Sequence, residues 1–132
     1  MKRVMVDMSV TILHHGHIRL LSKAKKYGHV IVALTTDEEI MSKKGYQPEL
    51  NFYQRKEILE SIKFVDEIVS SPWLLDDAFL DQHSVDILVH GSDNSNQVSS
   101  DRLLIFSRTE GVSSSLLRER SAAIHSAAID GS

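Results

Sequence analysis

The feature that most constrains the fold is Val30–Leu34, a near-continuous run of β-branched and apolar residues. Such a run is typical of a strand buried on both faces, as in parallel sheets covered by helices. A shorter apolar run, Val4–Val6, precedes it. Between the two runs, apolar residues from Ile18 to Ala24 repeat at helical spacing, and Gly28 follows a basic last turn and ends the predicted helix. The chain therefore begins with a predicted right-handed βαβ unit.

The same alternation continues along the chain. Apolar segments predict further strands over residues 65–69, 85–90 and 103–106. Helices are predicted after the capping residue Asn51, over 73–80 and over 113–129. Residues 1–132 are thus expected to form a single Rossmann-like α/β domain with a doubly wound, parallel, five-stranded sheet. Ligands of such sheets bind beyond the carboxyl ends of the strands, here at a switch point near the first strand.

Composition excludes several classes of protein. The chain has 15 Lys and Arg against 18 Asp and Glu, so its bulk charge does not favour nucleic acid. It contains no Cys, which removes disulfides, thiolate metal sites and cysteine nucleophiles. No apolar stretch approaches the ~18 residues of a membrane span. The apolar run within residues 1–7 is too short for a signal peptide. We therefore expect a cytoplasmic protein without a membrane partner.

Three histidines lie in one tetrapeptide, His14-His15-Gly16-His17, where the first strand meets the first helix. His14 and His17 share a face of a helical first turn, whereas His15 points elsewhere. Gly16 lets another group approach the backbone, and a helix N-terminus favours phosphate. Two imidazoles beside such a pocket can donate hydrogen bonds to a phosphoryl group under attack. Two alternatives stay open: the histidines only cap the helix, or they chelate zinc.

A second cluster follows the last predicted strand. Arg108 can bind two phosphate oxygens, Gly111 permits a turn, and Ser113 and Ser114 place hydroxyls at a predicted helix start. Taken alone, the cluster could equally be an ordinary helix start with solvated serines. Because both clusters follow strands of one parallel sheet, we predict that they share a phosphate pocket. By contrast, residues 43–50 contain two lysines, Gly and Pro, which predicts a mobile loop.

These segments resemble the cytidylyltransferase family of nucleotidyltransferases, over nearly the whole chain. The resemblance rests on residues 14–18, 34–38, 54–62, 64–66 and 108–113. The histidine motif is shared with adenylyl-transferring relatives, whereas Arg-Thr-Glu-Gly-Val-Ser at 108–113 is typical of members that use CTP. The resemblance implies transfer of CMP from CTP to a small phosphorylated alcohol or phosphonate, such as glycerol 3-phosphate or a two-carbon phosphonate, with release of pyrophosphate.

The resemblance also implies roles for individual residues. His14, His17 and Lys43 would be catalytic, and Lys44 and Arg55 would contact the acceptor. The expected nucleotide contacts are Ser9, Thr11, Gly16, Asp93, Arg108, Thr109, Gly111, Ser113 and Ser114. Asp66 matches a residue that lies near the subunit interface in these enzymes, although capping a turn is an equally good role. A Mg²⁺ ion would screen the triphosphate, with no dedicated protein site for it.

The resemblance and the apolar segments 64–65 and 73–75 predict a homodimer. Two departures from the family pattern leave the acceptor open. The usual Gly-x-Phe-Asp is replaced by residues 8–11, which end in Thr11, and Asn94 replaces a Trp. The run 113–118 also resembles adenylyl-transferring relatives. An adenylyltransferase, or a nucleotide-binding regulatory domain with little turnover, therefore remains the alternative.

Overall fold

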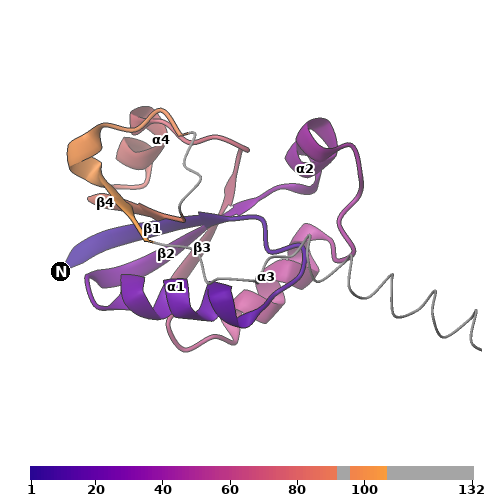
Figure 1. Ribbon diagram of the computed structural model, residues 1–132, viewed down its shortest axis with the longest axis horizontal. Helices are drawn as coiled ribbons and strands as arrows, with labels where there is room; N and C mark the ends of the chain where they lie inside the picture. The colour runs from indigo at the N-terminus through magenta and orange to yellow at the C-terminus, as the bar shows by residue number, and fades with distance from the viewer. Residues whose placement is uncertain (92–95, 107–132) are drawn as a thin grey trace, which may run out of the picture.

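A parallel five-stranded sheet forms the centre of the computed structural model, which describes residues 1–91 and 96–106 (Figure 1). The strands are β1 (Lys2–Met8), β2 (Gly28–Thr35), β3 (Glu67–Ser71), β4 (Ile87–His90) and β5 (Leu103–Ile105). Their order is β3-β2-β1-β4-β5, so the chain winds outward from β1 in one direction and then in the other. This order confirms the doubly wound fold and places the switch point between β1 and β4. The helix predicted over 113–129 lies outside the described residues.

Helices cover both faces of the sheet. They are α1 (His15–Lys25), α2 (Asp37–Lys44), α3 (Phe52–Glu60) and α4 (Asp77–Gln82), and a 3₁₀ turn (Ser100–Arg102) precedes β5. In Figure 1, α1 and α3 lie on one face, and α2 and α4 lie on the other. None of the helices among the described residues is both long and apolar enough to span a membrane.

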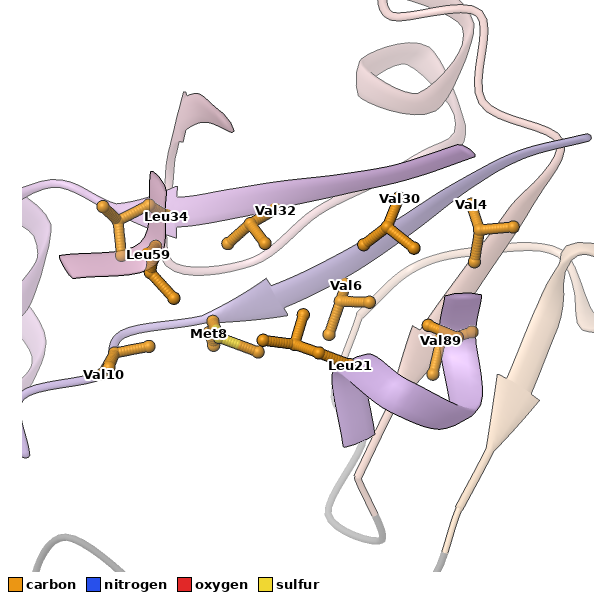
Figure 2. Packing of buried hydrophobic residues seen from close by; sticks show 11 residues of the cluster. Val4, Val6, Met8, Val10, Leu21, Val30, Val32, Leu34, Leu59 and Val89 are labelled. Atoms are coloured by element: carbon orange, nitrogen blue, oxygen red, sulfur yellow. The ribbon is translucent and has the colours of Figure 1, made fainter. Parts of the chain in front are cut away.

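Alternating side chains of the strands divide the core into two layers. Figure 2 shows the first, in which residues from β1 and β2 such as Val6 and Val32 pack with Leu21 of α1 and Leu59 of α3. The second layer joins Met5 and other residues of the opposite sheet face to the segment around α4. β2 is buried along most of its length, as its continuous apolar run predicts.

Helix caps explain where several elements begin. Asn51 and Gln54 form a reciprocal capping box at the start of α3, which confirms the predicted helix there. The helix predicted over 73–80 begins only at Asp77, because the Asp76 side chain caps it. Leu75 is therefore a core residue, 2% exposed, while Leu74 is 46% exposed. We expected the segment 73–75 to lie at a dimer surface, but the buried Leu75 cannot take part in such a contact.

α2 corrects the prediction of a mobile loop over residues 43–50. Lys43 and Lys44 form the last turn of this helix, and the loop begins at Gly45. The Thr36 hydroxyl caps the first turn, which is acidic, and Gly45 ends the helix with a φ of 77°. These charges complement the helix dipole at both ends. Ile40 anchors the helix as its buried residue.

Candidate phosphate site at the start of α1

The connection from β1 to α1 holds His14 and His17 against each other. Their ring centroids lie 4.0 Å apart, whereas His15 is exposed. The Gly16 N–H donates to Nδ1 of His14 (3.0 Å), and the His14 N–H donates to Nδ1 of His17 (3.1 Å). The two histidines thus form a capping box of their own at the first turn of α1.

This capping determines which nitrogen each ring offers to a ligand. Since Nδ1 of both His14 and His17 accepts a backbone N–H, the proton of each neutral ring lies on Nε2. Each ring can therefore cap the helix through Nδ1 and donate through Nε2. The interpretation that the histidines cap the helix and the interpretation that they bind phosphate are compatible.

Burial keeps both imidazoles neutral near pH 7. Burial, together with a smaller contribution from the neighbouring His14 imidazole, lowers the pKa of His17 to about 4. Burial also lowers the pKa of His14, with a smaller contribution from His15. Two neutral N–H donors at a helix N-terminus suit a phosphate, and α1 has no acidic residue in its first turn to repel one.

The lowered pKa of His17 predicts a loss of stability in mild acid. Between pH 6.5 and about 4 the unfolded chain binds a proton at His17 that the folded chain does not, so the free energy of unfolding falls as the pH falls. The largest contribution of this shift is about 3 kcal/mol. Urea unfolding from pH 7 to pH 4 measures it. His17→Gln keeps an acceptor for the cap and should weaken this pH dependence; an unchanged dependence would contradict the assignment.

Arg55, predicted to bind the acceptor phosphate, lies inside the protein. Arg55 is only 1% exposed, and its Nη2 forms an ion pair with Oδ1 of Asp37 (2.6 Å). Its other hydrogen bonds go to backbone carbonyl oxygens. The acceptor contact predicted for Arg55 is therefore corrected: the guanidinium is already used by the protein's own acceptors.

Lys43 and Lys44 are exposed at the end of α2, close to the loop 45–51. Nζ of Lys44 lies 5.5 Å from the ring centroid of Trp73, within reach of a cation–π contact. The role of these lysines toward phosphates stays a prediction, now on a helix rather than on a loop.

The other predicted site residues fall into two groups. Ser9 and Thr11 lie in the β1–α1 connection, Thr11 only 6% exposed, and Gly16 lies in the first turn of α1. The second group lies outside the described residues: Asp93, Arg108, Thr109, Gly111, Ser113 and Ser114. Their nucleotide contacts stay predictions.

Asp66 has a structural role among the described residues. Its carboxylate accepts from Nζ of Lys25 (2.6 Å) and from the Val30 N–H (2.8 Å), which ties α1 and β2 to the start of β3. Burial raises the pKa of Asp66, but these two hydrogen bonds outweigh it and hold the pKa below its ordinary value. These contacts give Asp66 a structural role that joins three elements, and its place near a subunit interface stays a prediction.

A polar cluster at the switch point was not predicted from the sequence. Oδ1 of Asp7 lies 2.5 Å from Nδ1 of His90, and Oδ2 of Asp7 accepts from the Asn96 amide (3.0 Å). Asn96 in turn accepts the Leu75 N–H (2.7 Å). The cluster places an imidazole held by a carboxylate at the carboxyl ends of β1 and β4. The available signals were an acidic residue, Asp7, directly after the apolar run of β1, and a histidine at the end of β4.

Across residues 1–91 and 96–106, no group of three or more His, Asp or Glu side chains is placed to hold a metal ion. In that part of the chain, a zinc ion at His14 and His17 has no third protein ligand. Magnesium, which usually keeps several waters and substrate phosphates as ligands, has no dedicated cluster there either.

The chain is similar to known proteins over most of its length. A family model described as "Cytidylyltransferase-like" matches residues 11–120. The chain is 35% identical over 127 residues to a glycerol-3-phosphate cytidylyltransferase of Staphylococcus aureus, covering 90% of this chain and 94% of the relative. It is 33% identical over 132 residues to the Bacillus subtilis protein of the same name, covering 94% and 100%.

More distant similarities are also found. A FAD synthase of Thermococcus sibiricus is 34% identical over 99 residues, covering 74% of this chain and 67% of the relative. Among solved structures, a lipopolysaccharide core biosynthesis protein from Thermoplasma volcanium matches with a TM-score of 0.68 and 21% identity, covering 83% of this chain and 98% of the other. At this identity the likeness shows the fold alone.

Proposed function

Because this chain belongs to the cytidylyltransferase-like family of nucleotidyltransferases, we propose that it transfers CMP from CTP to glycerol 3-phosphate. In this reaction an oxygen of the acceptor phosphate attacks the α-phosphorus of CTP and forms a new P–O bond. The bond from the α-phosphorus to the bridging oxygen breaks, and pyrophosphate leaves. Relatives named for this acceptor match over nearly their whole length, which supports the choice. A small phosphonate remains the second acceptor class.

The observation that carries the proposal is the pair of neutral imidazoles at the start of α1. Their Nε2–H groups, at the positive end of the α1 dipole, would surround the α-phosphate. Negative charge on its oxygens changes during attack, and fixed donors stabilise that change without reorganising. Positioning and charge stabilisation are sufficient for such a transfer, so no covalent intermediate with the protein is required.

Exposed cations near this edge suit a reaction between anions. We assign Lys43 and Lys44, on the last turn of α2, to the triphosphate and to the acceptor phosphate. A magnesium ion that arrives with the triphosphate would screen its charge. No step of this proposal passes through a metal ion held by the protein.

Pyrophosphate release tests the proposed function. With CTP, we expect release to depend on an added acceptor, and glycerol 3-phosphate to exceed ethanolamine phosphate, aminoethylphosphonate and hydroxyethylphosphonate. Faster release with a phosphonate would replace the acceptor but keep the reaction. CTP binding without release for any acceptor would favour a regulatory domain.

An adenylyl transfer is the second candidate function, because the FAD synthase relative shares much of the chain. The same assay with ATP in place of CTP, and with both nucleotides in competition, distinguishes the two. We expect CTP to be the substrate. We also propose that the protein acts as a homodimer and that it works in the cytoplasm.

A further inference from the structure

We propose that Arg55 is a positioning residue for this reaction, holding the β1–α1 connection in the conformation that places His14 and His17. The inference rests on the proposed function, and it assigns Arg55 an indirect role in place of the predicted contact with the acceptor. Arg55 lies on α3 and does not touch either histidine through any described hydrogen bond. Its effect would pass through the backbone that leads to them.

The guanidinium of Arg55 joins segments that are far apart in the sequence. Nη1 donates to the carbonyl oxygens of Ser9 (2.7 Å) and Thr35 (2.8 Å), which lie at the carboxyl ends of β1 and β2. Nε donates to the Leu50 carbonyl (3.1 Å), and Nη2 donates to the Asp37 carboxylate (2.6 Å). One planar group thus joins two strand ends, the start of α2 and the loop before α3. A lysine cannot reproduce this fork of donors.

The residue after Ser9 needs such support. Val10 has a φ of 51°, a left-handed conformation that is unusual for a β-branched residue. Strain of this kind persists only where the surroundings enforce it. Val10 is 4% exposed and belongs to the same core cluster as Leu59, which lies one helical turn after Arg55 on α3 (Figure 2). α3 therefore holds this turn by packing and by the hydrogen bond to Ser9.

The direction of the chain after Val10 determines where His14 begins α1. If the Ser9 carbonyl were released, Val10 could relax toward a common conformation, and the path to the two imidazoles would change. Misplacing a catalytic group by about 1 Å can cost about 10²-fold in rate. Arg55, which fixes only the path of the backbone from Ser9 to His14, would therefore change kcat indirectly, through the placement of the two histidines.

Arg55→Lys tests the proposal, because it keeps the charge beside Asp37 and loses the fork. Arg102→Lys is the matched control. Arg102 also donates to a backbone carbonyl, that of Val85 (2.6 Å), and to a carboxylate, that of Asp81 (2.8 Å), but it lies at the amino ends of the strands, away from the two histidines. We expect Arg55→Lys to lower kcat about 10- to 100-fold with a smaller change in the KM of the acceptor. Arg102→Lys should stay within about twofold of the parent.

Histidine NMR gives a readout that needs no turnover. In Arg55→Lys, the resonances of His14 and His17 should shift and the pKa of His17 should rise from about 4 toward 6.5, while His29 and His83 at the far edge stay unchanged. Unchanged His14 and His17 resonances would overturn the positioning role, even if the proposed function held. So would a raised acceptor KM with an unchanged kcat, which would restore a direct contact. If wild type lacks transfer activity but these resonances shift, only the proposed function fails.

Discussion

Replacing His17 with alanine is expected to lower kcat by about 10²–10³-fold while CTP binding weakens only modestly. The Nε2–H of His17 would bind the α-phosphate more strongly in the transition state than in the ground state, so its loss acts mainly on kcat. Steady-state kinetics with CTP and glycerol 3-phosphate, together with calorimetric titration of CTP, separates the two effects.

Because His17 also caps α1, two controls are needed. His17→Gln can still accept the His14 N–H and should preserve the fold, yet it should lose kcat nearly as far as His17→Ala. His15→Ala removes an exposed ring and should leave kcat within about twofold. Near-parental kcat in both His17 variants would show that the ring serves only as a cap.

Gly28→Ala is expected to destabilise the fold more than an ordinary surface substitution. Gly28 has a φ of 152°, and a Cβ there would lie 2.2 Å from the Lys2 carbonyl oxygen, which belongs to the neighbouring strand. The strained backbone alone costs about 1–3 kcal/mol, and relief of the clash requires β1 and β2 to separate. We expect a loss of about 3 kcal/mol or more in the free energy of unfolding, measured by urea denaturation.

Gly45→Ala is the matched control, since Gly45 also has a positive φ, 77°, but nothing lies within 4 Å of its added Cβ. It should cost only about 1 kcal/mol, the usual penalty of a left-handed residue that is not glycine. Equal losses in the two variants would mean that the close approach of Lys2 does not constrain Gly28.

Gly28 shows how far sequence reasoning reached in the fold. Its position predicted the end of the first helix, but α1 ends at Lys25 and Gly28 begins β2. The need for glycine comes from the Lys2 carbonyl, a contact that exists only once β1 and β2 pair. β2 could be predicted, because a strand buried on both faces must be apolar along most of its length. α2 was missed because its short sequence is mostly polar and a single buried residue, Ile40, anchors it.

The candidate site divides in the same way. The spacing of His14 and His17 was sufficient to bring the rings together, since it follows from helix geometry. Their neutral state was not predictable, because it depends on burial by the rest of the protein. Whether Arg55 faces inward is likewise a tertiary property. The contact between Asp7 and His90 requires β1 and β4 to be neighbours, which the order of strands in the sequence does not specify.

Transfer of an isotopic label tests the central claim, that an acceptor phosphate attacks the α-phosphorus of CTP at this site. The enzyme is incubated with CTP and glycerol 3-phosphate whose phosphate oxygens carry ¹⁸O, and the products are analysed by mass spectrometry. We predict that all of the label is found in a product that joins CMP to glycerol 3-phosphate, and that the pyrophosphate is unlabelled. Labelled pyrophosphate, or CMP formed without a joined product, would contradict the account.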